Sequence, residues 1–214
     1  MFKKYRKTLI VTTIIILLPM LAGLILWKQL PEQFPIHFNA AGEVDGWSSK
    51  AFGVFATPLL LAAIQWLCCL GSLAMDPRAN NLEGKVFSLV LWITPTLSIV
   101  MHALVYCTAM GVNVNVQIMM PLLIGLLMVI IGNWLPKCKP TWTLGIKLPW
   151  TLADENNWNR THRFAGPIWV AGGMIIMLCA LIGGALLWAM PVALVAMVAA
   201  PAVYSYLLFK GKIK

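Results

Sequence analysis

TWTLGIKLPWTLADENNWNRTHRFAG (Thr141–Gly166) is the polar segment that divides the chain, because four apolar runs precede it and one long apolar stretch follows it. It holds three tryptophans, three asparagines, two carboxylates and several basic residues, whereas its flanks consist mainly of Leu, Ile, Val, Ala and Met. A second polar segment, Leu30–Lys50, interrupts the first half of the chain. We expect specific recognition to depend on these two segments.

The composition is that of a helical membrane protein. Of the 214 residues, 60% are hydrophobic and 11% are charged, whereas soluble domains are about one quarter charged. Apolar runs of about 20 residues recur, which is the length that crosses a hydrocarbon core of about 30 Å. We therefore predict an all-α polytopic membrane protein with a single integral membrane domain over 1–214. Its six transmembrane helices are expected at 8–27, 52–75, 86–110, 117–135, 164–188 and 191–209.

The last two spans need a short connection. Only Ala189, Met190 and Pro191 interrupt an apolar stretch that is too long for one helix to fit the bilayer without extreme tilt. We therefore predict a tight reversal at Met190-Pro191.

Positive charge sets the expected orientation. All but Lys28 and Lys50 of the 16 Lys and Arg residues lie in the two termini, the 76–85 loop and the 136–166 loop. Because positively charged loops remain in the cytoplasm, we predict an N-in/C-in topology in which 30–50 faces outward and 136–166 is cytoplasmic. The net charge of +9 then reflects topology and contact with the anionic lipid bilayer. We expect no direct nucleic-acid binding, because the basic residues are dispersed.

The cysteines indicate no disulfide framework. Cys68, Cys69, Cys107 and Cys179 lie in the predicted spans and Cys138 at the cytoplasmic end of one, so the outward segment has none. We expect Cys138 to be a small apolar residue, and palmitoylation or thiol reactivity is the alternative.

The outward segment is predicted to form a hairpin-like cap. Pro31 ends the first helix, residues 36–39 alternate apolar and polar, and Ala40-Ala41-Gly42 supplies a turn. We expect three apolar side chains to lie against the bundle or the outer interface, namely Ile36, Phe38 and Trp47.

Three titratable groups of this cap are expected to converge on its other side. His37, Glu43 and Asp45 would suit a divalent metal or acid–base chemistry, recognition of a ligand or peptide, or hydrogen bonds within the cap itself. A zinc site normally contains more His or Cys, so we predict a structural cap and expect neither a metal nor a cofactor.

A helix is predicted within the 136–166 loop. Thr151 and Asp154 have the spacing of a capping box, and Asp154, Trp158 and His162 are spaced i, i+4, i+8 along one face. An adjacent row carries acid, amide and base: Glu155, Asn159 and Arg163. The helix is expected to lie in the membrane interface, or to run into the fifth span until Gly166-Pro167 bends it. Upstream, alternation from Trp142 to Trp150 favours an extended amphipathic stretch.

At these residues the sequence resembles a known family. GNWLPKCKPTWTLGIKLPWTLADENNWNRTHRFAG (132–166) is similar to the signature of the bacterial SdpI-like family, membrane immunity proteins against sporulation-delaying peptide toxin. The resemblance is carried by Gly132, Asn133, Gly145, Ile146, Pro149, Trp150, Thr151, Leu152, Trp158, Thr161, His162 and Arg163. We call 136–166 the signature loop. Lys147 and Leu148 stand where Arg-Thr is commoner in the family, and Lys cannot reproduce a bidentate guanidinium contact.

The outward segment resembles the N-terminal domain of unknown function that often accompanies this family. The matching residues are Leu30, Pro31, Pro35, His37, Phe38, Asn39, Gly42, Asp45, Gly46 and Lys50.

The resemblance implies a multi-pass protein of the bacterial cytoplasmic (inner) membrane that gives toxin resistance and is not an enzyme. It also implies signal transduction, in which a transcriptional repressor is retained at the membrane when a peptide toxin is sensed. We expect the toxin or partner surface in the signature loop to include Trp150, Asp154, Trp158, His162 and Arg163. The outward surface is expected to include His37, Asn39, Asp45 and Trp47.

Polar residues inside the spans should face the bundle interior, because hydrocarbon offers them no partners. These residues are Gln65, His102 and Asn133. A proton relay through His102 would need an acidic residue within a span, and the predicted spans contain none, so we favour a neutral, hydrogen-bonded His102. Small residues predict close helix contact in the bundle or in a homodimer: Gly172-Gly173, Gly183-Gly184, and Ala196 with Ala200.

Two alternative functions stay open. A small-solute or lipid transporter, or a flippase, would suit helices broken at Pro95 and Pro121. A membrane-embedded hydrolase or metal enzyme would use the His and carboxylate groups of either polar segment, but no nucleophile–base or H-E-x-x-H motif accompanies them.

Overall fold

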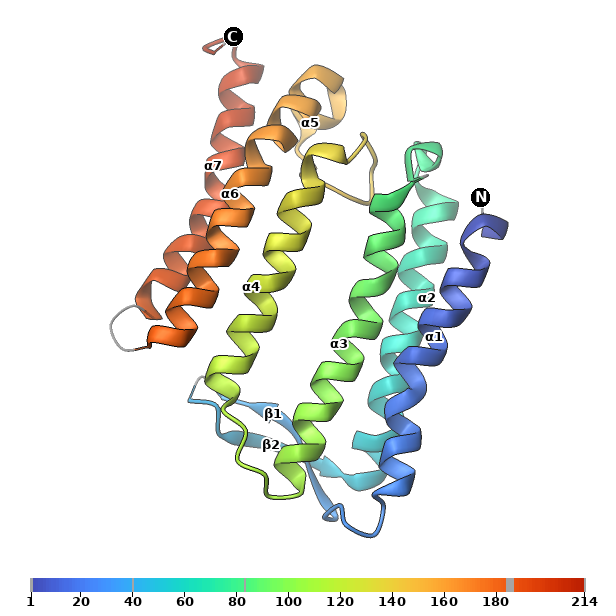
Figure 1. Cartoon of the computed structure of the whole chain (residues 1–214). Coiled ribbons are helices and arrows are strands. Elements are labelled where there is room, and N and C mark those ends of the chain that lie inside the picture. Colours follow the sequence, from blue (N-terminus) through green and yellow to red (C-terminus); the bar gives the residue numbers. More distant parts are fainter. Residues whose placement is uncertain (1, 40, 83, 184–186, 214) are drawn as a thin grey trace. The chain divides into compact units, whose positions relative to one another are not determined.

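The computed structural model describes residues 2–39, 41–82, 84–183 and 187–213. Its helices are α1 (Phe2–Ile25), α2 (Thr57–Met75), α3 (Lys85–Ala109), α4 (Val116–Trp134), α5 (Pro149–Ala153), α6 (Glu155–Ile182) and α7 (Ala189–Phe209) (Figure 1). Two strands, β1 (Gln33–Phe38) and β2 (Val44–Ser49), form an antiparallel pair between α1 and α2. A π-helical turn, Phe52–Ala56, leads directly into α2.

Six of the described helical segments are long and apolar enough to cross a membrane. They are Phe2–Ile25, Phe52–Met75, Lys85–Ala109, Val116–Lys137, Glu155–Ile182 and Ala189–Phe209. The predicted all-α polytopic membrane fold is therefore confirmed, whereas the N-in/C-in orientation stays a prediction.

The reversal between the last two spans lies earlier than predicted. α6 ends at Ile182, where Gly183 adopts a φ of 72° and closes the helix, and Met190 and Pro191 lie in the first turn of α7. A proline is tolerated there, because the first backbone N–H groups of a helix have no intrahelical acceptor. The prediction of a reversal at Met190-Pro191 was wrong, and Gly184 of the predicted Gly183-Gly184 contact lies outside the described residues.

The helices with internal prolines are continuous. Pro95 lies inside α3 and Pro121 inside α4, so the breaks that would have suited a transporter are not present. Membrane helices tolerate proline where other groups satisfy the freed carbonyls.

The chain groups into two compact units. The N-terminal unit consists of Met1–Met75 and Glu83–Val116, and the C-terminal unit of Asp76–Leu82 and Gln117–Lys214. Segment 76–82, which connects α2 to α3 along the chain, thus belongs to the C-terminal unit. The single integral membrane domain that we expected over 1–214 stays a prediction.

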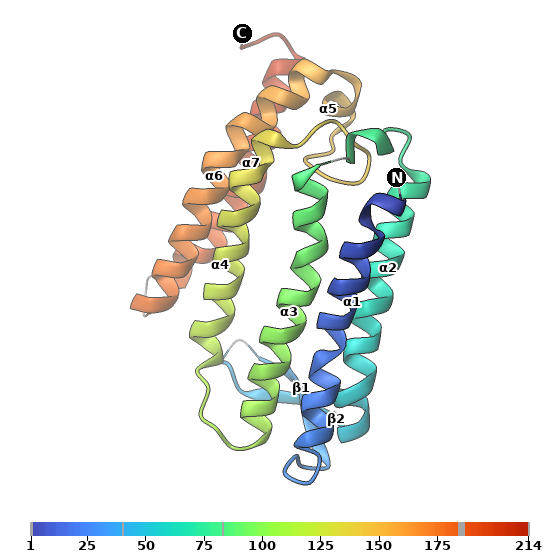
Figure 2. The same cartoon turned by 45° about the vertical axis from the view of Figure 1, so that its right-hand side comes forward.

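In the N-terminal unit α1, α2 and α3 lie side by side, with the hairpin at the end remote from the N-terminus (Figure 2). Buried side chains hydrogen-bond across the helices: Gln65 donates to the Thr12 hydroxyl at 2.6 Å, and Ser98 to the Ile16 carbonyl at 2.9 Å. At the hairpin end a buried cluster is formed by Leu30, Phe34, Val54 and Tyr106. This cluster holds the strands on the helices.

In the C-terminal unit glycines bring α4 and α6 into backbone contact. A Cβ added at Gly132 would lie 2.9 Å from the carbonyl oxygen of Gly166, and a Cβ at Gly166 would lie 2.9 Å from that of Gly132. Two turns along each helix, a Cβ at Gly125 would lie 2.6 Å from the carbonyl oxygen of Gly173. Glycine is therefore required at these positions, and the close contact predicted at Gly172-Gly173 lies within the chain.

Candidate functional site

One carboxylate anchors the start of the signature loop. Asp76 is 6% exposed, and its Oδ2 accepts hydrogen bonds from the backbone N–H of Trp142 at 2.9 Å and of Thr143 at 3.0 Å. The Thr143 hydroxyl donates to the same oxygen at 2.8 Å, and the backbone N–H of Arg78 donates to Oδ1 at 2.8 Å. A buried carboxylate needs such partners to offset its lost hydration.

Two further side chains of segment 76–82 bind the loop. The Arg78 guanidinium donates to the Leu152 carbonyl at 3.0 Å, and the Asn81 amide donates to the Pro140 carbonyl at 2.6 Å. None of the three residues was predicted, because nothing in their spacing relates them to partners that lie 59 to 74 residues downstream. The available signal was a short loop with the composition of a capping turn, Asp76-Pro77-Arg78.

Trp158 and His162 form the centre of the loop. Both are 0% exposed, and their rings stack with centroids 4.1 Å apart. The Trp158 indole N–H donates to the Cys138 carbonyl at 2.8 Å. Nε2 of His162 accepts from the backbone N–H of Ile146 at 2.9 Å, and its Nδ1 lies 2.8 Å from the Trp158 carbonyl. The tautomer with its proton on Nδ1 satisfies both contacts.

Gly145 allows the loop backbone to lie against these rings. Its φ is 108°, a conformation that side chains with a Cβ rarely adopt. An added Cβ would also lie 2.6 Å from Nε2 of His162 and 2.7 Å from the Trp158 ring. Both the backbone conformation and the available space therefore require glycine.

Thr151 and Asp154 cap two different helices. The Thr151 hydroxyl accepts from the backbone N–H of Leu148 at 2.8 Å and so closes the first turn of α5. Asp154 is itself the N-cap of α6 and accepts from the backbone N–H of Asn156 at 2.9 Å. The predicted Thr151–Asp154 capping box was wrong, because the chain turns between them and starts a second helix.

α6 runs without interruption from this cap into the fifth span. It is 28 residues long and contains Pro167, whereas about 20 residues cross the hydrocarbon core. Of the two placements predicted for the helix, continuation into the span is therefore correct. The alternating Trp142–Trp150 stretch forms bends and the start of α5 rather than a strand.

A second buried network joins α5, α6 and α7. The Trp150 indole N–H donates to the Ser205 hydroxyl at 2.8 Å, which donates to the Asn157 side-chain oxygen at 2.7 Å. The Asn157 amide returns a hydrogen bond to the Ser205 carbonyl at 3.0 Å, and the Thr161 hydroxyl donates to the Asn157 oxygen at 3.0 Å. Sequence reasoning missed Asn157 and Ser205, since a lone Ser in an apolar helix has no distinctive spacing.

The five residues predicted to form the toxin or partner surface of the signature loop divide into two sets. Trp158 and His162 are buried, and Trp150 is half-buried against Ser205. Asp154 and Arg163 are exposed. Only the exposed pair is available for direct contact with a partner, whereas the buried residues shape the loop; the binding role of all five stays a prediction.

Cys138 is a buried residue near the start of the signature loop. It is 7% exposed, and burial raises the pKa of its thiol to about 11. The thiol therefore stays protonated at neutral pH, as expected of a small buried residue rather than a reactive one. All five cysteines of the chain are free.

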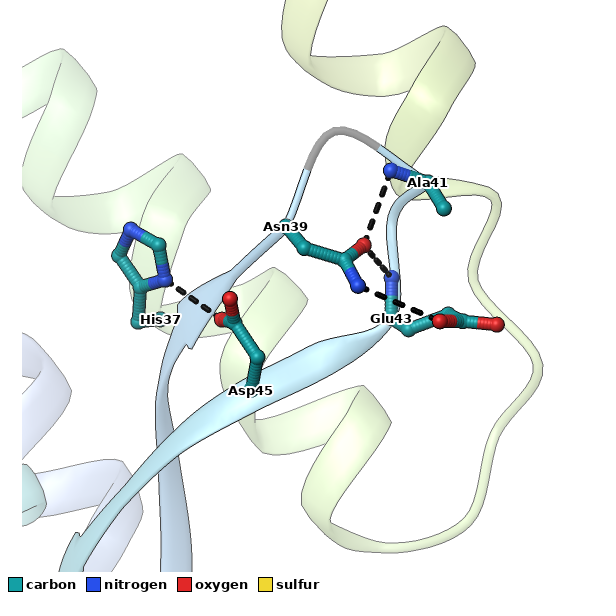
Figure 3. Close-up of polar contacts among 5 residues, drawn as sticks. All are labelled: His37, Asn39, Ala41, Glu43 and Asp45. Carbon is teal, nitrogen blue, oxygen red and sulfur yellow. Dashed lines mark hydrogen bonds and ion pairs between the residues drawn. The ribbon is translucent and has the colours of Figure 1, made fainter.

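Segment 30–50 forms the predicted hairpin, and we call β1–β2 the hairpin cap. Bulges interrupt its register on both sides of His37, which brings Nδ1 of His37 within 2.5 Å of Oδ1 of Asp45. Figure 3 shows this pair beside the turn, where the Asn39 side-chain oxygen accepts from the backbone N–H of Ala41 at 2.9 Å and of Glu43 at 3.0 Å.

These contacts favour the structural interpretation of the hairpin cap. The Asn39 amide also donates to Glu43 Oε2 at 3.2 Å, so Glu43 pairs with Asn39 and does not join His37 and Asp45. Ala40 of the predicted turn lies outside the described residues. Within the part of the chain that the structure describes, no group of three or more His, Cys, Asp or Glu side chains could hold a metal ion.

The apolar residues of the hairpin cap are not placed as predicted. Phe34 is 1% exposed and is the side chain that packs on the helices, whereas Ile36 and Trp47 are 43% and 54% exposed. Of the two environments predicted for Ile36 and Trp47, burial against the bundle was wrong. The alternation of buried and exposed side chains along β1 is interrupted at Pro35, because the pairing of β1 with β2 is irregular after this residue.

Lys50 ties the hairpin cap to the end of the first span. It is 6% exposed, and its ammonium donates to the Trp27 carbonyl at 3.1 Å, pairs with Glu32 at 2.9 Å and lies 5.0 Å from the centre of the Trp27 ring. Trp27 follows the last turn of α1, where carbonyls lack intrahelical donors. Sequence reasoning gave Lys50 no role beyond charge.

The polar residues of the spans follow the prediction except for one. Gln65 and His102 are buried, at 4% and 6% exposed, and His102 has contacts to the Ser98 carbonyl at 2.7 Å and the Thr57 hydroxyl at 2.9 Å. Asn133 is exposed, so its predicted interior position was wrong. It lies one residue before the end of α4, where the membrane interface can hydrate an amide.

Comparison with known proteins matches both polar segments to families. The model of the SdpI/YfhL protein family matches residues 137–205, and that of a domain of unknown function (DUF1648) matches residues 14–62. The chain is 27% identical over 173 residues to "Immunity protein SdpI" of Bacillus subtilis (strain 168), which covers 79% of this chain and 80% of the relative. No solved structure is significantly similar. These matches confirm the resemblance to the SdpI-like family predicted from the sequence, and together with the six long apolar helices they support a multi-pass bacterial membrane protein.

Proposed function

We propose that this chain makes a bacterial cell immune to a membrane-active peptide toxin and retains a transcriptional repressor at the membrane when the toxin is present. The similarity to an immunity protein favours a non-enzymatic immunity role. Residues 137–205, which match that family, include the whole buried network around Trp158, His162, Asn157 and Ser205. This coincidence is the observation that carries the proposal, because it gives the matching segment a buried, hydrogen-bonded centre.

Segment 76–82 supplies a physical route for a signal. It connects α2 to α3 along the chain, yet Asp76, Arg78 and Asn81 hold the signature loop. A toxin that binds one arrangement of α2 and α3 better than another would shift this segment and with it the loop. The exposed Asp154 and Arg163 would then present a changed surface to the repressor.

The immunity proposal is tested by survival. A toxin-sensitive bacterium that expresses the chain is challenged with sporulation-delaying peptide toxin and with other membrane-active peptides, beside an empty vector. Protection should be lost in Trp158→Ala and His162→Ala and retained in Trp142→Ala, whose side chain is 55% exposed in the same loop. Membrane levels are measured by immunoblot, and a parent chain that is present in the membrane but protects against no peptide would contradict the proposal.

The signalling proposal needs variants that leave the scaffold intact. Asp154→Asn and Arg163→Gln change exposed groups, so we expect protection to persist while a fluorescently tagged repressor encoded beside the chain no longer moves to the membrane on toxin treatment. Unchanged recruitment of the repressor in both variants would contradict the assignment of Asp154 and Arg163 to the repressor-binding surface.

The transporter alternative loses the broken helices that favoured it, since α3 and α4 are continuous.

A further inference from the structure

A cavity of about 350 Å³ lies in the N-terminal unit between β1, the turn Phe52–Ala56, α2 and α3. Its size falls within the range of small-molecule and side-chain binding pockets. The wall is mainly apolar and includes Phe34 and Ile36 from β1, Leu61 from α2, and Met101 and Val105 from α3. In the predicted orientation this end of the unit faces outward.

The polar groups in the wall already have partners. Nε2 of His102 lies 2.9 Å from the Thr57 hydroxyl, and its Nδ1 lies 2.7 Å from the Ser98 carbonyl. The Thr57 hydroxyl lies 2.6 Å from the Gly53 carbonyl. These internal hydrogen bonds leave an apolar surface for an occupant, and an apolar group that leaves water to fill the cavity gains about 25 cal/mol per Å².

The cavity is accessible from the surface of the unit. Ile36 and Leu60, which line it, are 43% and 53% exposed. Ile36 also belongs to the hairpin cap, next to the exposed His37–Asp45 pair. An occupant long enough to leave the cavity beside Ile36 would therefore reach the hairpin cap.

Charge identifies the kind of occupant. Residues 30–50 contain three carboxylates, Glu32, Glu43 and Asp45, and a single lysine, Lys50, which is 6% exposed and paired. With Lys28 included this side remains net negative, although the whole chain carries +9. Such a surface repels the phosphate of an anionic lipid headgroup and attracts a basic group.

We propose that the cavity between β1, α2 and α3 binds an apolar segment of a membrane-active peptide, with a basic group of that peptide over Glu43 and Asp45. The proposal rests on the proposed immunity function and names the site that this function requires. Binding would involve the ends of α2 and α3, the two helices that segment 76–82 connects.

The test uses paired tryptophan substitutions in the full-length chain. Met101→Trp and Leu61→Trp fill the cavity, whereas Ala103→Trp and Leu59→Trp place the same ring two residues away, at exposed positions of the same helices that do not line it. Each variant is purified into lipid nanodiscs, and its affinity for fluorescently labelled sporulation-delaying peptide toxin is measured beside cell survival. The nanodiscs contain phosphatidylglycerol at two different fractions.

We expect peptide affinity to fall about tenfold or more in both cavity-filling variants, the loss that accompanies one apolar side chain denied its pocket, and to change little in both controls. The double variant Glu43→Gln/Asp45→Asn should lower peptide affinity by less than the cavity-filling variants do. Its effect on affinity should be larger at low salt than at high salt. Equal affinity in all four tryptophan variants would overturn the cavity site while leaving the immunity function in place.

The remaining outcomes are also decisive. A parent chain that neither binds nor protects contradicts the immunity function and the cavity together. Loss of co-purified phosphatidylglycerol from the cavity-filling variants in detergent, before they enter nanodiscs, with peptide affinity unchanged, would replace the peptide by a lipid chain as the occupant. If one filling variant fails to reach the membrane, the other, on a different helix, still decides the result.

Discussion

The two polar segments of this chain are built in opposite ways. In the signature loop Trp158, His162 and Asn157 are buried, and each hydrogen-bonds to backbone far along the chain. In the hairpin cap the polar groups pair with near neighbours, as His37 does with Asp45, and both of these side chains stay exposed. Polarity in a membrane-protein sequence therefore marks a buried scaffold in one segment and an accessible surface in the other.

The largest effect that tests this contrast is expected at Trp158. Trp158→Ala should lower the free energy of unfolding by about 4 kcal/mol, because it removes a wholly buried ring and leaves the Cys138 carbonyl without its donor. Trp142→Ala, at a 55% exposed position, should cost less than about 1 kcal/mol. Unfolding of the purified chain by SDS titration in mixed micelles measures both, and equal losses would contradict a buried scaffold.

The next largest effect is expected at Asp76. Asp76→Ala should cost about 3 kcal/mol, because it leaves the backbone N–H groups of Trp142 and Thr143 buried without an acceptor. The comparison is Asp154→Ala, which removes an exposed helix cap and should cost about 1 kcal/mol. The same titration distinguishes them, and a smaller loss at Asp76 than at Asp154 would show that segment 76–82 does not hold the signature loop.

Cys138 gives the scaffold a pH dependence. Burial raises the pKa of its thiol from 9.0 to about 11, so above pH 9 the unfolded chain loses this proton before the folded chain does. Stability from this group is therefore fully present below pH 9 and falls by about 2 kcal/mol as pH rises through 11. Unfolding at pH 8, 9.5 and 11 should show the fall in the parent and a smaller one in Cys138→Ala; identical pH profiles would mean that the thiol is not buried.

Most of the helical framework was predictable, because each span carries its own signal. Apolar length located all six candidate spans, and the Pro, Gly and alternation signals located the hairpin cap. The errors arose where two local signals compete. Pro191 suggests a turn, but it also fits the first turn of α7, and the helix before it already ends at Ile182.

The sequence predicted which residue types the signature loop would use, but not which of their side chains would be buried. Regular spacing placed Trp158 and His162 on one helical face, but spacing cannot tell whether that face meets solvent or the folded loop. Their burial depends on Gly145 and on Asp76, residues whose partners are distant in sequence. Ser205 escaped prediction for the same reason, since its hydrogen bonds join α7 to residues 48 and 55 positions away.

The smallest effect on stability, and the sharpest test of the contrast, is expected in the hairpin cap. Asp45→Asn removes a charge that pairs with His37 across exposed positions, so it should change the free energy of unfolding by less than about 0.5 kcal/mol. If the hairpin cap is a recognition surface, the same variant should still lower survival under toxin, whereas Ser48→Ala, on the same strand, should not. If Asp45→Asn keeps its stability but no longer protects cells, recognition can be separated from the scaffold, because Trp158→Ala is expected to lose stability and protection together. Full protection in Asp45→Asn and Trp47→Ala alike would assign the hairpin cap a structural role only and move toxin contact away from its exposed face.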